Sequence, residues 1–395
     1  MSVTLEMNEI ADSLPEITAI RRDIHAHPEL GLQEERTSTL VAKELRKLGI
    51  EVTEKIGGTG VVGTIRGSVA GTRSIGLRAD MDALPIQEIT GLPYASTTDG
   101  QMHACGHDGH TAMLLGAARY LARHNDFAGM IHLIFQPGEE TLKGALGMIE
   151  DGLLERFPCD AIYGLHTGPG VPATVFATLP GILMAGSGRL DIVFRGKGGH
   201  GGLDAGAGQE LAQVQAHFLV ELEAYTRDRK AEGHHVSATV AYVQGGRPDV
   251  YNLLPTEIRL QGSTRAFDGA EHGLLHGKMK TIAEEVAGRS AAVADVHTEI
   301  GVPPLSNSIR EAEIAMRASV GKERVVTEGK PIPASEDFAF LLEKRPGAFI
   351  FLGNGVSEDG SFHNIHTPSF DFNDAVLPFG IRYWINLVHE ELSVR

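Results

Sequence analysis

The amino-acid sequence predicts an α/β protein in which a three-layer domain, built around a mostly parallel sheet, contains a smaller inserted domain. Two observations lead to this prediction. Helical patterns alternate with short apolar runs in the first and last parts of the chain, which is typical of helices packed on a parallel sheet. The middle instead has the order strand, helix, strand, strand, helix, strand. The predicted large domain covers 1–185 and 302–395, and the predicted insertion covers 186–301.

The elements of the large domain follow from the spacing of its apolar residues. Apolar residues three and four positions apart predict amphipathic helices over 8–24 and 108–123. Another helix is expected over 36–48, where Gly49 follows as a typical residue beyond a helix end. The last helix is predicted over 376–391. Short apolar runs predict five buried strands, which are Val61–Ile65, Ile75–Ala79, Met130–Phe135, Ala161–Leu165 and Ala348–Leu352.

The inserted domain is predicted from period-two alternation and two intervening helical patterns. Its strands and helices are expected, in chain order, over 189–196, 209–226, 237–244, 256–266, 270–288 and 291–300. This βαββαβ order is that of the ferredoxin-like split βαβ unit. Glycine and proline residues at both junctions indicate hinges.

Composition and charge exclude several classes of partner. The 395 residues carry 51 acidic and 35 basic side chains, and the formal charge of -16 repels nucleic acid and anionic membrane surfaces. Residues 161–188 lack charged side chains, but their prolines and glycines would break a membrane-spanning helix. The two cysteines, Cys105 and Cys159, are too few for a disulfide framework, and Cys159 is expected to be simply buried. With no signal peptide evident, we expect a cytoplasmic protein.

The densest candidate site is the segment Met102–His110, which precedes a predicted helix. It places Cys105 two residues before His107, and these two side chains can bind one metal ion or bridge two. The alternative is a buried cysteine followed by a helix that Asp108 caps.

Two neighbouring carboxylates, Glu139 and Glu140, form the second candidate. They directly follow the apolar strand 130–135, and ligands of α/β folds bind at the carboxyl ends of strands. In extended chain the two side chains point in opposite directions, so that one can bind metal while the other acts as a base. The alternative is a solvated turn with two surface acids.

Three further groups follow predicted strands or lie in loops. His166 ends an apolar strand, either His363 or His366 can reach a site, and Asp80 closes the strand that carries Arg78. Each of these residues has a purely structural alternative, such as a core histidine or an internal ion pair. Together with the first two candidates they have the composition of a two-metal hydrolytic site. The mixed sulfur, nitrogen and oxygen ligands suit Zn²⁺, with Mn²⁺, Co²⁺ and Ni²⁺ also possible.

The predicted insertion has candidates of its own. A glycine-rich loop over 196–202 presents His200 and lacks the pattern of a phosphate-binding loop. Asn252 and Arg265 flank a predicted strand, where they can bind a carbonyl or carboxylate group or form structural hydrogen bonds.

These motifs resemble those of the M20 family of metallopeptidases, in particular the amidohydrolase branch with hippurate hydrolases, N-acyl-amino-acid amidohydrolases and auxin-conjugate hydrolases. The resemblance covers nearly the whole chain. The matching segments are Arg22–Gly31, Leu77–Pro85, Met102–His110, Gln136–Glu140, Gly164–His166, Gly196–His200, Ser335–Phe338 and His366–Pro368.

The resemblance implies roles for individual residues. Two divalent metal ions would be bound by five side chains, with the cysteine bridging; these are Cys105, His107, Glu140, His166 and His366. Glu139 would be the general base, Asp80 would orient a ligand histidine, and His200 would stabilise the oxyanion, often across a dimer. Asn252 and Arg265 match substrate contacts. The large domain would be a zinc-peptidase-like catalytic domain, and the insertion a lid and dimerisation domain.

The predicted function is therefore hydrolysis of the amide bond in small N-acyl amino acids or related conjugates by a homodimer or higher homo-oligomer. The alternatives are a dipeptidase or aminoacylase of the same superfamily, a metal-containing binding protein without turnover, and a metal-independent cysteine hydrolase. The sequence departs from the family at Gly138, where alanine is usual, and in the segments 141–143 and 201–210. The last two departures are expected near the substrate.

Overall fold

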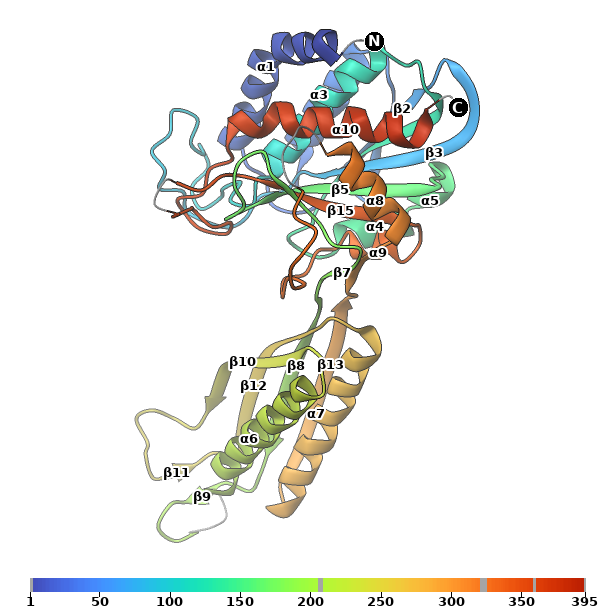
Figure 1. Ribbon diagram of the computed structural model, residues 1–395. Helices are drawn as coiled ribbons and strands as arrows, with labels where there is room; N and C mark the ends of the chain where they lie inside the picture. Colours follow the sequence, from blue (N-terminus) through green and yellow to red (C-terminus); the bar gives the residue numbers. More distant parts are fainter. Residues whose placement is uncertain (1–2, 205–208, 320–324, 358–359, 394–395) are drawn as a thin grey trace. The chain divides into compact units, whose positions relative to one another are not determined.

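The computed structural model describes residues 3–204, 209–319, 325–357 and 360–393. The chain forms two compact units (Figure 1). The first unit comprises Met1–Leu183, Ser306–Lys330 and Asp337–Arg395. The second comprises Met184–Leu305 and Pro331–Glu336.

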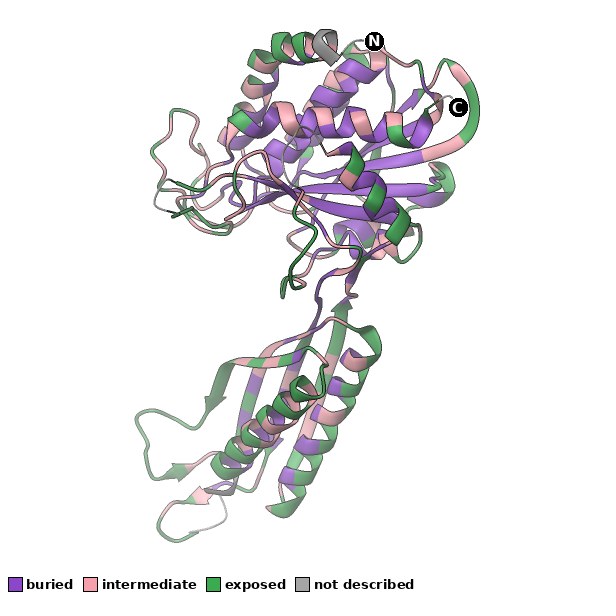
Figure 2. Ribbon diagram, in the orientation of Figure 1, coloured by how far each residue is buried: buried purple, intermediate pink, exposed green. Residues whose placement is uncertain are grey.

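A seven-stranded sheet forms the centre of the first unit. Its strands, in spatial order, are β1 (Glu51–Ile56), β2 (Gly60–Arg66), β4 (Ala128–Gln136), β3 (Val69–Asp80), β5 (Ala161–Gly168), β15 (Gly347–Gly353) and β6 (Phe176–Ala177). The four strands from β4 to β15 run parallel, and the outer strands pair antiparallel. All eight residues of β5 are buried, as expected for a parallel strand covered on both faces (Figure 2).

Helices cover both faces of this sheet and confirm the predicted three-layer α/β class. The helices α1 (Val3–Ala26), α3 (His107–Arg123) and α10 (Leu377–Leu392) pack together over one face (Figure 1). The short helices α4 (Gly144–Glu150) and α9 (Ala339–Leu342) lie on the opposite side. The remaining elements of this unit are α2 (Glu35–Lys47), α5 (Leu153–Arg156), α8 (Ile309–Ala318) and a 3₁₀ turn over Asp374–Val376.

The second unit has the predicted ferredoxin-like topology. Its elements, in chain order, are β8 (Gly186–Arg195), α6 (Gln209–Ala231), β10 (Val236–Gly245), β12 (Glu257–Ala266), α7 (Gly269–Arg289) and β13 (Val293–Val302). The strands form an antiparallel sheet in the order β10-β12-β8-β13. Leu190, Ile192 and Phe194 of β8 are buried in one core with residues of both helices, which is the period-two face that the sequence predicts.

Short strands that the sequence analysis does not predict complete the fold. In the second unit β9 (Gly199–His200) pairs with β11 (Leu253–Leu254). Near the junction of the two units, β7 (Gly181–Met184) pairs with β14 (Leu305–Asn307). Among the described residues, no helix combines the length and the apolar composition that crossing a membrane requires.

Candidate metal centre

The predicted metal ligands of the first unit meet at the carboxyl edge of its parallel strands. β3 ends at Asp80, β4 ends at Gln136, and β5 carries His166 near its end. Cys105 and His107 lie where the chain enters α3, and the turn between them depends on Gly106, which has a left-handed φ of 89°. A Cβ atom at Gly106 would lie 2.9 Å from Cγ2 of Thr167, so the loop packs directly against β5.

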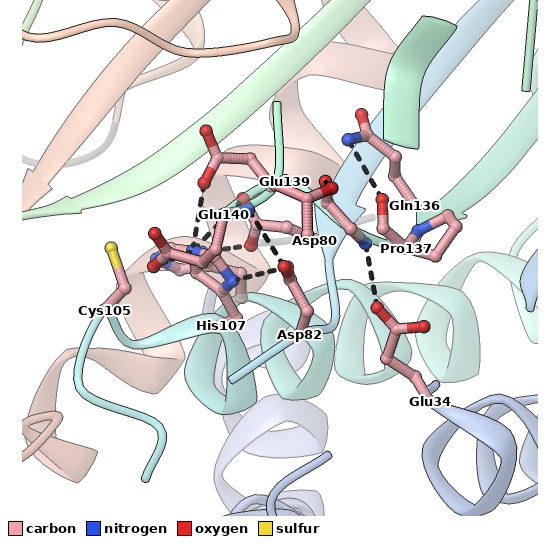
Figure 3. Close-up of polar contacts among 12 residues, drawn as sticks. Glu34, Asp80, Asp82, Cys105, His107, Gln136, Pro137, Glu139 and Glu140 are labelled. Carbon is pink, nitrogen blue, oxygen red and sulfur yellow. Dashed lines mark hydrogen bonds and ion pairs between the residues drawn. The ribbon is translucent and has the colours of Figure 1, made fainter. Parts of the chain in front are cut away.

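Of the groups of possible ligand atoms among the described residues, two contain Glu140, each with its atoms within 4.8 Å of one another. One group is Cys105, Glu140 and His366, and the other is His107, Glu139 and Glu140. His166 joins them because its Nε2 atom lies 3.4 Å from Sγ of Cys105. All five predicted ligands and the predicted base therefore lie in one cluster, and Glu140 belongs to both groups. Figure 3 shows four of these residues, Cys105, His107, Glu139 and Glu140.

The imidazole of His107 has one nitrogen bound and the other directed at carboxylates. Its Nδ1 atom lies 3.1 Å from Oδ1 of Asp82 and donates to it. Its Nε2 atom lies 3.9 Å from both Glu139 Oε2 and Glu140 Oε1. This buried Nε2 atom forms no hydrogen bond with the described residues. A buried nitrogen without a hydrogen bond, facing two carboxylates, is what a metal ligand requires.

The charge balance of the cluster also fits a cation. Burial opposes protonation of His107, but the carboxylates of Asp80, Asp82 and Glu140 outweigh it and raise its pKa to about 10. Burial and the carboxylates of Glu140, Glu139 and Asp80 raise the pKa of the Cys105 thiol well above its usual value. A bound divalent cation would reverse both effects by compensating the negative charge.

Hydrogen bonds distinguish His166 from its neighbour His110. His166 donates from Nδ1 to the carbonyl oxygen of Thr167 at 2.7 Å, which leaves the lone pair of Nε2 facing Cys105. The N–H of Thr167 donates to Nε2 of His110 at 2.8 Å, and Nδ1 of His110 donates to Oδ1 of Asp80 at 2.6 Å. Both nitrogens of His110 are thus engaged, whereas His166 retains a nitrogen for metal binding.

Asp80, which the resemblance implies would orient a ligand histidine, binds His110, a histidine outside the predicted ligand set. It holds His110, forms an ion pair with Arg78 at 2.6 Å, and lies 3.8 Å from Nε2 of His107. Asp82 is the residue that orients His107, and its second oxygen accepts the backbone N–H of Glu140 at 2.9 Å (Figure 3). Sequence reasoning missed Asp82, although it belongs to the same Arg78–Asp82 motif; the signal was a second carboxylate just beyond the strand end.

Glu139 and Glu140 do not point in opposite directions, which corrects the expectation from extended chain. β4 ends at Gln136, and a turn follows in which Gly138 has a φ of 61°. Because the chain turns here, both carboxylates approach Nε2 of His107. Glu139 is buried, with 6% of its surface exposed.

His366, rather than His363, reaches the cluster. Its Nε2 atom lies 3.3 Å from Oε1 of Glu140, and its backbone N–H donates to the carbonyl oxygen of Ala104 at 2.7 Å. His366 has a left-handed φ of 60°, an uncommon conformation for a residue with a side chain. His363 is exposed, with Nδ1 at 2.9 Å from Oγ of Ser369.

His200 and Asn252 are neighbours in the second unit. Nδ1 of His200 accepts the backbone N–H groups of Gly202 at 3.1 Å and Leu203 at 3.2 Å. The imidazole proton therefore lies on Nε2, which is 3.4 Å from Nδ2 of Asn252. Asp204 accepts the backbone N–H of His200 at 2.8 Å. The segment 201–210, in which the sequence departs from the family, therefore contacts this histidine directly. Residues 205–208 of that segment lie outside the described residues.

Arg265 lies on β12, away from these two residues in the sequence. Its guanidinium donates to the carbonyl oxygen of Thr264 at 2.9 Å, and burial lowers its pKa. It lines a cavity of about 120 Å³ together with Lys230, His235 and Ser237, and no acidic residue lines that cavity.

Comparison with known proteins gives the family. The model of peptidase family M20/M25/M40 matches residues 76–390. The chain belongs to this family. As a member of family M20 it is a hydrolase that acts on amide bonds.

Relatives and solved structures match over almost the whole length. A hippurate hydrolase of Campylobacter jejuni is 36% identical over 98% of this chain and 99% of its own length. An N-acetyl-L-cysteine deacetylase of Bacillus subtilis is 35% identical over 92% of this chain and 85% of its own length. The crystal structure of the YXEP protein of Bacillus subtilis, described as a dinuclear metal binding peptidase from the M20 family, superimposes with a TM-score of 0.82. It is 31% identical and covers 96% of this chain and 98% of its own.

Proposed function

We propose that this M20 protein is a metal-dependent amidohydrolase that cleaves the amide bond of small N-acyl amino acids and related conjugates. The observation that carries the proposal is the convergence of Cys105, two carboxylates and three histidines at one sheet edge. The names of the two relatives describe enzymes acting on N-acylated amino acids, which supports this substrate class.

We propose that five side chains would hold two divalent ions here; these are Cys105, His107, Glu140, His166 and His366. The donors fit such ions because His107 and His166 each direct an Nε2 atom into the cluster while Nδ1 is held by a neighbouring oxygen. When bound, the ions supply Lewis acidity that polarises the substrate carbonyl and lowers the pKa of water.

Glu139 is the proposed general base. Its carboxylate is buried beside the ligands, 3.9 Å from Nε2 of His107, where it reaches a water molecule attacking the substrate. Glu139 takes the proton of that water and then donates it to the leaving amine.

His200 is the proposed oxyanion donor, and Arg265 the proposed carboxylate anchor. Because Nδ1 of His200 accepts two backbone N–H groups, the ring proton lies on Nε2, and this nitrogen can donate a hydrogen bond. Asn252 lies within reach of the same nitrogen and is proposed to contact substrate. Arg265 is half-buried, and none of the described carboxylates forms an ion pair with it, so its guanidinium is available to a ligand.

The second unit is proposed as the lid and dimerisation domain, with 186–301 inserted into the catalytic domain formed by 1–185 and 302–395. Its strand β10 is an edge strand that carries exposed Tyr242 and Val243, and Tyr251 nearby is 99% exposed. A second copy of the chain would cover such an edge. We place the enzyme in the cytoplasm, where the free thiol of Cys105 stays reduced.

Amine release from a panel of N-acetyl, N-benzoyl and indole-acetyl amino acids tests the function. The protein is assayed as purified, after chelation, and after return of Mn²⁺ or Zn²⁺. Turnover that is lost on chelation and restored by metal is the expected result. Cleavage only of dipeptides with a free amine would identify a dipeptidase instead. Turnover that survives complete chelation would identify a cysteine hydrolase, and no turnover on any member with metal bound would contradict the proposal.

A further inference from the structure

We propose that Glu34 is a positioning residue for the general base, acting through the backbone of the turn that carries Glu139. This inference rests on the proposed function of Glu139. Glu34 lies 104 residues away in the sequence from Gly138, whose backbone it holds.

The carboxylate of Glu34 is completely buried and accepts three hydrogen bonds. Its Oε1 atom accepts the backbone N–H of Gly138 at 2.8 Å and that of Leu32 at 2.8 Å. Its Oε2 atom accepts the hydroxyl of Thr59. Figure 3 shows the side chain of Glu34 directed at the turn that follows Pro137. One carboxylate therefore joins its own loop to the turn of the active site.

The two backbone donors at Oε1 belong to residues with left-handed backbone. Leu32 has a φ of 66° and Gly138 a φ of 61°. A Cβ atom at Gly138 would lie 2.7 Å from Cδ2 of Leu32, so the two loops lie in close contact here. A left-handed residue with a side chain persists only where its surroundings stabilise it. Glu34 supplies that stabilisation for both loops at once.

Two buried carboxylates thereby hold the backbone N–H groups of the residues immediately before and after Glu139. Glu34 accepts the N–H of Gly138, and Asp82 accepts the N–H of Glu140 at 2.9 Å. Asp82 also orients His107, so its loss would disturb a ligand directly. Glu34 touches none of the proposed ligand side chains, and its effect should fall on the placement of the base.

Three variants separate positioning from general stability. Glu34→Ala removes the acceptor for Gly138, whereas Glu34→Gln retains an oxygen that can accept both N–H groups. Glu29→Ala is the matched control, because Glu29 lies five residues earlier and accepts the N–H groups of Arg36 at 2.9 Å and Thr37 at 2.8 Å at the start of α2. This control removes two partly buried bonds from a carboxylate to backbone N–H groups without removing a bond to the turn.

We expect Glu34→Ala to lower kcat about 10- to 100-fold with KM changed less than about threefold, because displacing a catalytic group by about 1 Å has effects of this size. Metal content, measured by elemental analysis, should stay at the wild-type value. Glu34→Gln should recover most of kcat. Glu29→Ala should lower the melting temperature and leave kcat within about twofold of wild type.

Hydrogen exchange of the peptide over 137–143 gives a readout that does not depend on turnover. The amide of Gly138 should exchange faster in Glu34→Ala than in wild type or Glu29→Ala. If the wild-type protein hydrolyses no substrate but this difference is found, the proposed function is wrong, whereas the role of Glu34 in holding the backbone of Gly138 is confirmed. Unchanged exchange, a kcat loss equal to that of Glu29→Ala, or a kcat loss that only follows loss of metal would each overturn the positioning role.

Discussion

Asp82 accepts the Nδ1–H of His107 at 3.1 Å, and this contact sets the direction of the opposite ring nitrogen. The same carboxylate accepts the backbone N–H of Glu140 at 2.9 Å. One side chain thus orients a proposed ligand from α3 and one from the turn after β4. Outer carboxylates of this kind fix the tautomer of a ligand histidine and raise its basicity.

We therefore predict that Asp82→Asn weakens metal binding about 10- to 100-fold, since the amide accepts His107 less well and cannot compensate a cation. Competition with a metal-binding dye measures the affinity. Asp99→Asn, at an exposed position on a loop, is the control and should bind metal like wild type. Equal metal affinity in Asp82→Asn and wild type would show that Asp82 has no part in ligand orientation.

Loss of His200 should lower kcat, and the contribution of His200 to kcat should depend on its hydrogen bond with Asp204. His200→Ala should lower kcat about 100- to 1000-fold, as expected for loss of one oxyanion donor, with a small change in KM. Asp204→Ala removes the acceptor of the His200 backbone N–H and should lower kcat less, whereas Asp204→Asn retains an acceptor and should stay near wild type. Steady-state kinetics of the three variants measure this. An Asp204→Asn variant as impaired as Asp204→Ala would contradict a role through that hydrogen bond.

His25 should make the stability of the protein depend on pH. Burial opposes its charge, but Asp108, whose Oδ2 atom lies 2.8 Å from its Nδ1, outweighs burial and raises the pKa of His25 to about 9. In the unfolded chain the pKa of histidine is about 6.5. The folded state holds the proton more tightly, so this stabilisation is complete below about pH 6.5 and is lost as pH rises through about 9.

Urea unfolding of chelated protein at several pH values between 6 and 10 measures this contribution. Wild type should lose stability across that range, and His25→Asn should lose less. His27→Asn is the control, because the His27 side chain is 43% exposed. A His25→Asn variant with the same pH dependence as wild type would assign the effect to other groups.

The sequence predicts the fold wherever a hydrophobic period is strong. The alternation in β8, with Leu190, Ile192 and Phe194 facing one core, is confirmed, and so is the helix that follows His107. β1 was missed because it is an edge strand whose charged residues are exposed and which has no apolar run. For the site, residue types and strand ends indicated a two-metal centre, and the resemblance to family M20 supplied the choice of ligands, such as His366 rather than His363.

What the sequence could not predict depends on contacts between distant segments. Glu34 and Gly138 are brought together by contact between two loops that are distant in the sequence. The sequence of neither loop indicates that it contacts the other. The directions of the Glu139 and Glu140 side chains depend on a turn that begins one residue after the strand. Continued extended chain would instead place the two side chains on opposite sides. The choice between Asp80 and Asp82 depends on which carboxylate faces His107 and which faces His110.

Glu139→Gln tests the central claim most directly, because it replaces the proposed base by an uncharged side chain of the same shape. Bound metal and substrate turnover are measured on the same preparation. We predict that the variant retains the metal content of wild type and loses turnover by at least about 100-fold, the size expected for removal of a general base. A metal-loaded variant that turns over substrate at the wild-type rate would contradict the assignment of Glu139 and the mechanism built on it.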